Sequence, residues 1–105
     1  PPLYSAYHSI KEVFCNGTNK KVCDVVGPVC ETADFIGKDR SLSVAKGDYI
    51  AVESVGAYGF SLSSNYNTRM KSAEYLIAKD SQNIRKIRGR DTIEQILENE
   101  KKYLL

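Results

Sequence analysis

The residues of this chain that are best suited to chemistry lie in the stretch GPVCETAD, residues 27–34, where Cys30 and Glu31 follow a Gly-Pro break. An unperturbed thiol has a pKa of about 8.5, so it is mostly protonated at neutral pH and can donate a proton. A carboxylate beside it favours the protonated form. We therefore interpret Cys30 as a proton donor rather than a nucleophile. A buried, structural cysteine is the alternative that composition alone favours.

A second candidate site lies in VGAYGFSLSSNYN, residues 55–67, which is rich in Gly and Ser and contains Tyr58, Phe60 and Tyr66. Phenol hydroxyls, small residues and backbone N–H groups together are a common means of holding a phosphate group. The sequence contains neither a P-loop nor a G-x-G-x-x-G motif, so no motif indicates phosphate binding. Tyrosines that close one end of a barrel are the alternative interpretation.

The other reactive side chains give weaker signals. Cys15, Cys23 and Cys30 are separated by eight and seven positions, which does not match the C-x-x-C pairs of zinc and redox sites, so we expect free thiols. His8 has no carboxylate or cysteine at a spacing that would form a dyad, and we expect it to be structural. A Ser-His-Asp site cannot be assembled from these residues.

Composition limits the class of protein. The 105 residues, with 42% hydrophobic and 27% charged side chains, allow one globular domain, 1–105. A net charge of +2 is too weak to indicate a nucleic-acid or membrane partner. No apolar run approaches the ~18 residues of a membrane span, and no secretory signal is visible, so we expect a cytoplasmic protein. The opening PPLY, without methionine, suggests a piece of a longer chain.

The pattern of apolar residues predicts a mostly antiparallel β fold that positions these side chains. Strands are expected over 3–14, 22–26, 47–54, 73–80 and 83–90, with Ile84 and Ile87 of the last directed inward. Asn16-Gly17 predicts a hairpin between the first two strands, and the polar residues 34–46 predict a loop. One helix is expected over 91–104, with a cap at Asp91 or Thr92.

The basic run at the end of the last predicted strand is Arg85, Lys86, Arg88 and Arg90. We expect it to form a solvated face towards Glu94 and Glu98, and RNA binding is a weaker interpretation. The predicted fold is thus a mainly β, Greek-key-like barrel or sandwich with an irregular Gly/Ser/Tyr segment and a C-terminal helix.

Three ordered segments resemble one family. GPVCETAD resembles a CESxD element, GDYIAVESVGAYGFSLSSNYN resembles a GD…GAY…SSNYN element, and PPLYSAYHSI resembles the segment after a substrate-binding arginine. All three occur in the diaminopimelate decarboxylases, and the match covers residues 1 to about 77. Two positions differ from the family, with Ala33 in place of a glycine and Met70 within an R-P-R element.

The resemblance implies an activity and a domain. Diaminopimelate decarboxylases use pyridoxal 5'-phosphate to convert meso-diaminopimelate to L-lysine and CO2. They are homodimers in which a (β/α)8 barrel domain carries the lysine that binds the cofactor. This chain resembles the C-terminal β domain alone, and we expect it to be inactive without the barrel domain.

The resemblance also assigns roles to four residues. Cys30 corresponds to the proton donor that acts across the dimer interface, and Glu31 to the carboxylate that binds the distal ammonium of the substrate. Tyr58 corresponds to the tyrosine that approaches the cofactor and its phosphate. Tyr4 corresponds to a tyrosine that holds the distal carboxylate, and its partner arginine would fall just before Pro1.

Two alternatives remain at this point. A decarboxylase of the same fold type that acts on another basic amino acid or a carboxylated polyamine would keep Cys30 and Tyr58 but change the residue at Glu31. A small RNA-binding barrel would use Tyr58, Phe60 and Tyr66 as stacking platforms.

Overall fold

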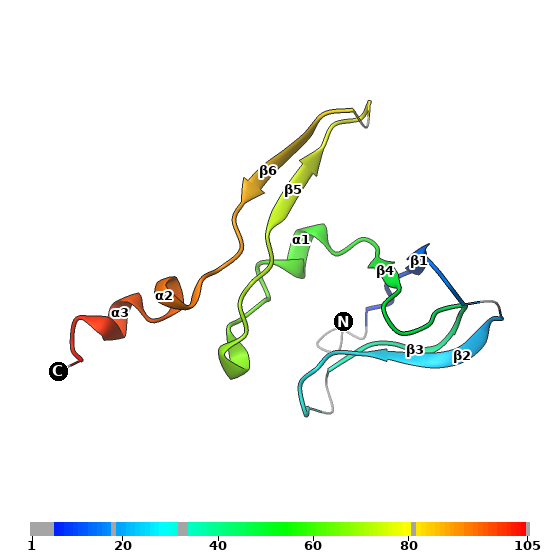
Figure 1. Cartoon of the computed structure of the whole chain (residues 1–105), viewed down its shortest axis with the longest axis horizontal. Helices are drawn as coiled ribbons and strands as arrows, with labels where there is room; N and C mark the ends of the chain where they lie inside the picture. The colour runs from blue at the N-terminus through cyan, green and yellow to red at the C-terminus, as the bar shows by residue number, and fades with distance from the viewer. Residues whose placement is uncertain (1–5, 18, 32–33, 81, 105) are drawn as a thin grey trace. The chain divides into compact units, whose positions relative to one another are not determined.

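The computed structural model describes residues 6–17, 19–31, 34–80 and 82–104 of the chain (Figure 1). They divide into two compact units, Pro1–Ala57 and Tyr58–Leu105, which are described separately below. Tyr4, Ala33 and the first strand's predicted residues 3–5 lie outside the described residues.

The first unit contains two antiparallel pairs of strands (Figure 1). β1 (Ile10–Phe14) pairs with β4 (Tyr49–Val52), and β2 (Lys21–Val26) pairs with β3 (Phe35–Leu42). The predicted strands at 22–26 and 47–54 are confirmed. The predicted hairpin between the first two strands is wrong, because β1 and β2 each pair with a strand that comes later in the sequence.

Long-range hydrogen bonds explain why Asn16 and Gly17 do not form a hairpin turn. The Asn16 amide N–H and side-chain NH2 both donate to the Asp48 carboxylate at 2.9 Å, and Ser43 Oγ donates to the Gly17 carbonyl at 2.8 Å. Hydrogen bonds from the backbone N–H of Ala45 and then of Asn16 lower the pKa of Asp48. Asn16 and Gly17 therefore bond to the segment before β4 instead of forming a hairpin turn.

The polar residues predicted as a loop at 34–46 contain β3, the longest strand in the described part of the chain. That prediction is wrong because β3 carries its charges on exposed positions, Lys38 and Asp39, while Gly37 and Leu42 are buried. Asp39 has φ of 53°, and its N–H bonds to the Asp24 carboxylate at a β-bulge. A bulge breaks the two-residue alternation on which the prediction depended.

β1 contacts β3 in the first unit. A Cβ at Gly37 would lie 2.9 Å from Ile10 Cδ1, so glycine is required for this close approach. Arg40 Nη1 donates to the His8 carbonyl at 2.8 Å, and His8 Nδ1 lies 3.0 Å from the Glu53 carbonyl oxygen. These contacts agree with the structural role predicted for His8.

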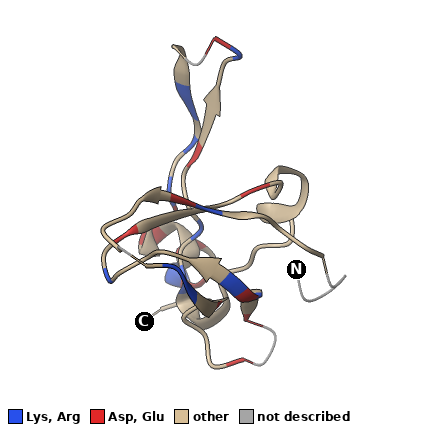
Figure 2. Ribbon diagram, turned by 90° about the vertical axis from the view of Figure 1, so that its right-hand side faces the viewer, with Lys and Arg blue, Asp and Glu red and all other residues tan. Residues whose placement is uncertain are grey.

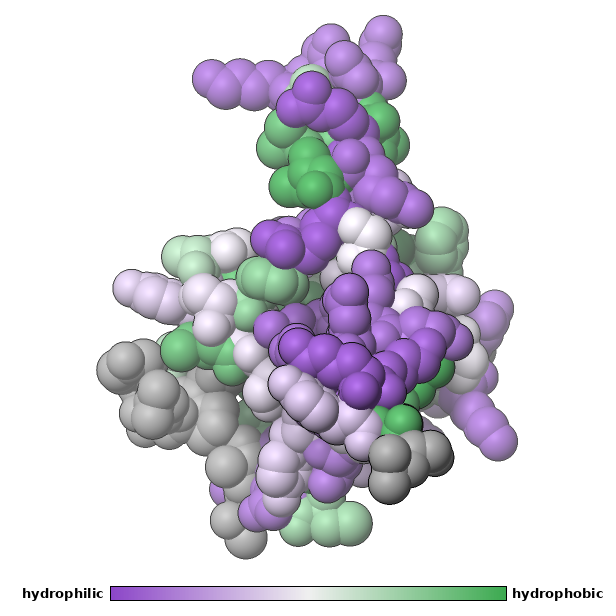
Figure 3. All heavy atoms as spheres, turned by 90° about the vertical axis from the view of Figure 1, so that its left-hand side faces the viewer, coloured by the Kyte–Doolittle hydropathy of each residue, from purple (hydrophilic) through white to green (hydrophobic). Residues whose placement is uncertain are grey.

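The second unit is built on a β-hairpin of β5 (Glu74–Ile77) and β6 (Ile84–Arg88), which lie within the strands predicted over 73–80 and 83–90. Before it come the short helix α1 (Gly56–Gly59), which crosses the unit boundary, and the 3-10 turn η1 (Tyr66–Thr68). The expectation that Ile84 and Ile87 point inward is wrong for this chain, since every residue of β6 is exposed. In Figure 2, blue lysine and arginine residues mark part of one strand of the hairpin, and Figure 3 shows hydrophobic (green) residues among hydrophilic (purple) ones there.

The C-terminal residues form two helices instead of the one predicted, α2 (Ile93–Ile96) and α3 (Glu98–Lys101). Of the two predicted cap residues, Asp91 and Thr92, Thr92 caps the helix. It forms a capping box with Gln95, in which the Thr92 hydroxyl accepts from the Gln95 N–H and the Gln95 side chain accepts from the Thr92 N–H. The helix is interrupted at Leu97, whose ψ is 4°. The apolar residues Ile93, Ile96 and Leu97 end at this point, and residues 98–102 are all polar, so apolar spacing supported only the first part of the predicted helix.

The mainly β class with short helices is confirmed. The described strands form three separate two-stranded sheets and no closed barrel. Among the described residues, no helix combines the length and apolar character needed to cross a membrane.

Candidate functional site

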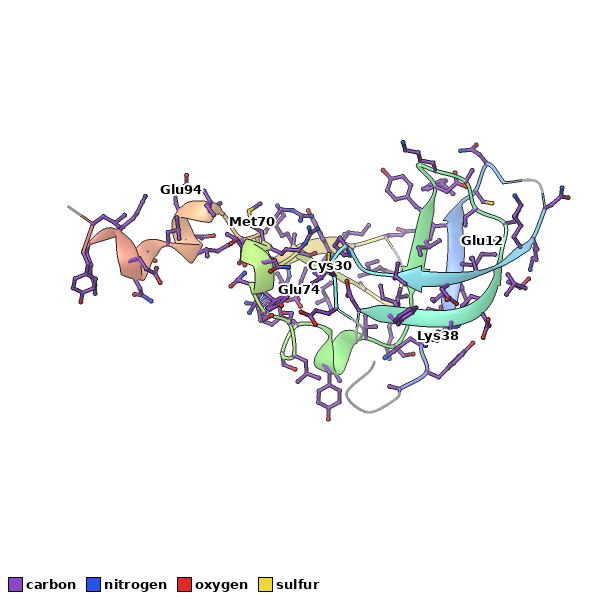
Figure 4. The ribbon with its side chains drawn as sticks, turned by 90° about the horizontal axis from the view of Figure 1, so that it is seen from below. Glu12, Cys30, Lys38, Met70, Glu74 and Glu94 are labelled. Carbon is purple, nitrogen blue, oxygen red and sulfur yellow. The ribbon has the colours of Figure 1, made fainter. Side chains whose placement is uncertain are left out.

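Cys30 and Glu31 lie in the connection between β2 and β3 (Figure 1), beyond the last residue of β2, Val26, and Cys30 is labelled in Figure 4. The Gly27 N–H donates to the Asp34 carbonyl at 2.8 Å, which extends the ladder past the Val26–Phe35 pair. The Asp34 N–H in turn donates to the Glu31 carbonyl at 3.0 Å. Main-chain hydrogen bonds therefore close the ends of this segment, called the Cys30 loop (residues 27–34) below.

The Asp34 side chain also folds back onto the Cys30 loop. Its Oδ2 accepts the backbone N–H of Val29, the residue before Cys30, at 2.7 Å. A Cβ at Gly27 would lie 2.2 Å from Asp34 Oδ1, so only glycine leaves room for this carboxylate. Gly27 thus has a second role besides ending β2, because it leaves space for the Asp34 carboxylate.

Cys30 is a free, exposed thiol, and Glu31 is also exposed. The alternative of a buried, structural cysteine does not fit this position. Cys15 is exposed and Cys23 is partly buried, and both are free. No cluster of three or more His, Cys, Asp or Glu side chains suited to a metal occurs in the described part of the chain.

Tyr58 lies in α1, with 66% of its surface exposed. The residues after it turn back on the helix, because the Leu62 N–H donates to the Tyr58 carbonyl at 3.0 Å and the Ser63 N–H donates to the Phe60 carbonyl at 2.9 Å. The Tyr58 side chain is thus presented at the start of a hydrogen-bonded segment, called the Tyr58 segment (residues 58–71) below.

The Phe60 ring joins the Tyr58 segment to the β5–β6 hairpin. The Arg88 guanidinium lies 3.6 Å from the ring centroid, and Lys71 Nζ lies 4.8 Å from it. Arg88 Nε also forms an ion pair with Glu74 Oε2 at 2.8 Å. Arg88 therefore pairs within the hairpin, and the expectation that the basic run faces Glu94 and Glu98 is wrong for this residue.

Asp91 holds the other end of the Tyr58 segment. Its Oδ2 accepts the backbone N–H of Lys71 at 2.9 Å and the side-chain amide of Asn65 at 3.0 Å, and its own N–H donates to the Lys71 carbonyl at 3.1 Å. The hydrogen bond from Lys71 and then that from Asn65 lower the pKa of Asp91. The same Asn65 amide donates to the Arg69 carbonyl at 2.8 Å.

The structure thus places Cys30 and Glu31 on one loop of the first unit and Tyr58 in the second unit. The supporting contacts of Asp34 and Asp91 were not predicted from the sequence, in which Asp34 was the last residue of the CESxD-like element and the start of a predicted loop, and Asp91 was a candidate cap. A glycine and an aspartate at opposite ends of a strand connection could have indicated the first of these contacts. No local pattern indicates the second, because its partners lie 20 and 26 positions away.

Comparison with known proteins identifies the family. Residues 1–56 match the family described as "Pyridoxal-dependent decarboxylase, C-terminal sheet domain". The chain therefore belongs to the pyridoxal-dependent decarboxylases, and it corresponds to their C-terminal sheet domain.

Comparison with individual proteins is more specific than the family match. The chain is 52% identical over 97 residues to diaminopimelate decarboxylase of Haemophilus influenzae, covering 91% of this chain and 23% of that protein. It is 46% identical over 100 residues to diaminopimelate decarboxylase of Neisseria meningitidis, covering 95% and 24%. A crystal structure of the Helicobacter pylori diaminopimelate decarboxylase complexed with L-lysine matches with a TM-score of 0.87 and 42% identity, over 99% of this chain and 25% of that one. This chain spans about a quarter of the length of these relatives.

Proposed function

We propose that this chain is the C-terminal domain of a diaminopimelate decarboxylase, which converts meso-diaminopimelate to L-lysine and CO2 with pyridoxal 5'-phosphate. The observation that carries the proposal is the identity of 46–52% to diaminopimelate decarboxylases over nearly the whole of this chain. The Helicobacter pylori relative is complexed with L-lysine, the product of this reaction. The remaining three quarters of the enzyme supply the (β/α)8 barrel domain, and the enzyme acts as a cytoplasmic homodimer.

The described residues fit the cofactor in part. The exposed Tyr58 hydroxyl can donate to a phosphate oxygen, and a Cβ at Gly56 would meet nothing within 4 Å, so the approach to α1 is open. The N–H groups of Leu62 and Ser63 are already donated to carbonyls and cannot form an anion cradle. Tyr58 is therefore one contact to the phosphate, and the barrel domain provides the others.

Cys30 and Glu31 act on the substrate in this proposal. The pyridoxal group, when bound, accepts the electron pair that the departing carboxylate leaves behind. The Cys30 Sγ–H then donates a proton to the substrate carbon from one side, across the dimer interface. The exposed Glu31 carboxylate binds the distal ammonium of the substrate through a charge-assisted hydrogen bond worth about 1.5–3 kcal/mol. Tyr4 holds the distal carboxylate.

The predicted sandwich is the finer description of the fold that we propose for the complete domain. The β1–β4 and β2–β3 sheets would be two of its layers. The close approach of Ile10 to Gly37 and the burial of Leu42, of which 5% is exposed, support this packing.

The alternatives are less well supported. A decarboxylase for another basic amino acid or a carboxylated polyamine would carry a different acidic arrangement after the cysteine, whereas this chain has Glu31 directly after Cys30. An RNA-binding module would need Phe60 as a free stacking platform, but Arg88 already lies over that ring. Unchanged mobility of single-stranded RNA in a gel with excess protein would exclude RNA binding.

The experiment that tests the proposal replaces Cys30 with alanine in the full-length enzyme. We expect turnover to fall by about 100-fold or more, in keeping with the loss of a positioned acid, while the cofactor absorbance is retained. Cys15→Ser is the matched control, because it changes an exposed thiol outside the site and keeps a hydrogen-bond donor. Unchanged turnover of Cys30→Ala would contradict the donor role.

A mixed dimer tests whether Cys30 acts across the interface. One chain carries Cys30→Ala, and the other lacks the barrel lysine that binds the cofactor. Because one active site of this dimer combines two intact contributions, activity should return. Absence of any recovery would show that Cys30 acts within its own subunit.

A further inference from the structure

We infer that Asp34 is a positioning residue for the decarboxylation, and that it acts by fixing the backbone that presents Cys30 and Glu31. The inference rests on the proposed function of these two residues. It assigns to Asp34 and Gly27 a role that neither the motif match nor the proposed chemistry requires.

The first observation is the direction of the Asp34 hydrogen bonds. Its carboxylate accepts the N–H of Val29 at 2.7 Å, its N–H donates to the Glu31 carbonyl at 3.0 Å, and its carbonyl accepts the Gly27 N–H at 2.8 Å. The main chain is thus held immediately before Cys30 and immediately after it, at Glu31.

The second observation is steric. The Asp34 carboxylate occupies the space where a side chain of Gly27 would lie, since a Cβ there would be 2.2 Å from Oδ1 and 2.5 Å from Cγ. Real Cβ contacts do not become this short, so any side chain at Gly27 must displace Asp34. A substitution at either Gly27 or Asp34 should therefore disrupt the same hydrogen bond, from the Val29 N–H to the Asp34 carboxylate.

The consequence for the reaction follows from the exposure of Cys30. Cys30 is exposed in this domain, so the position of its thiol depends on the backbone that carries it. The hydrogen bonds of Asp34 hold that backbone, and a proton donor misplaced by ~1 Å loses as much as ~100-fold in rate. A neutral acceptor of the same shape should serve as well as the carboxylate, since the partner of Oδ2 is a backbone N–H.

The test compares four variants of the full-length enzyme. Asp34→Ala removes the acceptor and Gly27→Ala displaces it, and both should lower kcat by roughly tenfold to a hundredfold and raise the KM for diaminopimelate. Asp34→Asn keeps an acceptor oxygen and should restore near wild-type kinetics. Gly89→Ala is the matched control, because a Cβ there would meet nothing within 4 Å.

Two readouts separate positioning from general damage. The affinity for pyridoxal 5'-phosphate, measured by absorbance titration, should be the same in all four variants, which also shows that they fold. The rate of alkylation of Cys30 by iodoacetamide, followed by mass spectrometry, should change in Asp34→Ala and Gly27→Ala but not in Asp34→Asn.

Cys30→Ala is the reference that distinguishes failure of the positioning role of Asp34 from failure of the donor role of Cys30. If Asp34 acts through Cys30, adding Asp34→Ala to Cys30→Ala should not lower kcat further. If Cys30→Ala lowers kcat but Asp34→Ala does not, the inference about Asp34 is overturned and the proposed function stands. Asp34→Asn as impaired as Asp34→Ala would also overturn it, because charge would then matter instead of the hydrogen bond. If Cys30→Ala has no effect, the donor role itself fails.

Discussion

The two segments that carry the proposed site residues are held in different ways. In the Cys30 loop, hydrogen bonds to the main chain join neighbours in sequence, with Asp34 as the central partner. The Tyr58 segment is instead held by two side chains that come later in the sequence. The Arg88 guanidinium of β6 lies over the Phe60 ring, and the Asp91 carboxylate, just before the α2 cap, accepts the Lys71 N–H. The comparison indicates that the loop depends on local backbone geometry, whereas the Tyr58 segment depends on charged groups far away in sequence.

The two segments should also affect different steps of the reaction, and Tyr58→Phe tests this for the Tyr58 segment. Loss of a hydrogen bond from the hydroxyl to the charged phosphate should weaken cofactor binding by about 1.5–3 kcal/mol, or roughly 10- to 100-fold. Absorbance titration of the full-length apoenzyme measures the affinity. Cys30→Ala should leave it unchanged, and equal losses in both variants would remove the distinction.

Phe60→Ala tests whether the ring anchors the Tyr58 segment. Removing a partly buried ring that contacts Arg88 and Lys71 should lower the opening free energy of residues 58–71 by about 1–2 kcal/mol. Hydrogen exchange of peptides from the full-length enzyme measures this free energy. Tyr103→Ala is the control, since that ring is 76% exposed. Increased exchange in the Cys30 loop instead of residues 58–71 would contradict the prediction.

Acidification should loosen the Tyr58 segment through Asp91. Its folded pKa lies below that of the unfolded chain, so it contributes stability above the unfolded value of about 3.9, and this contribution is lost as the pH falls through the folded pKa. Hydrogen exchange of residues 58–71, corrected for intrinsic rates, should therefore rise below about pH 4. In Asp91→Asn this pH dependence should be reduced.

A control for the acid effect exists in the first unit. Asp48 also has a lowered pKa, but its hydrogen bonds come from Ala45 and Asn16. Asp91→Asn should leave the acid response of residues 10–17 intact. The same pH profile in residues 58–71 of Asp91→Asn and the parent enzyme would show that Asp91 is not responsible.

Thr68→Asn should have the smallest effect, and of opposite sign. Thr68 has φ of 58°, a conformation that is unfavourable for a β-branched residue and tolerated by asparagine. The substitution should stabilise the Tyr58 segment by roughly 0.5–1 kcal/mol, seen as slower hydrogen exchange. Asn67 already has φ of 55°, so Asn67→Thr should have the reverse effect.

Local signals predicted those elements whose partners are close in sequence. The two strands of the β5–β6 hairpin were predicted from their own apolar runs, and Thr92 was one of the two residues predicted to cap the helix, with its partner Gln95 only three positions away. The Asn16-Gly17 hairpin was predicted on an equally local signal and is wrong, because Asp48 and Ser43 bind these residues from more than twenty positions away. A turn dipeptide specifies a bend but not the strand to which the chain returns.

By itself the sequence determined the β class, the thiol of Cys30 next to a carboxylate, and the ordered motifs that relate Cys30, Glu31, Tyr4 and Tyr58 to one family. These follow from residue type and spacing along the chain. Tertiary structure alone decided the pairing of β1 with β4, the strand β3 within a polar stretch, and the contacts of Asp34 and Asp91. The physical reason is that a hydrogen-bond acceptor is not restricted to near neighbours. Only the folded chain shows that the Asp34 carboxylate fills the space left by Gly27 and holds the backbone of Val29, the residue before Cys30.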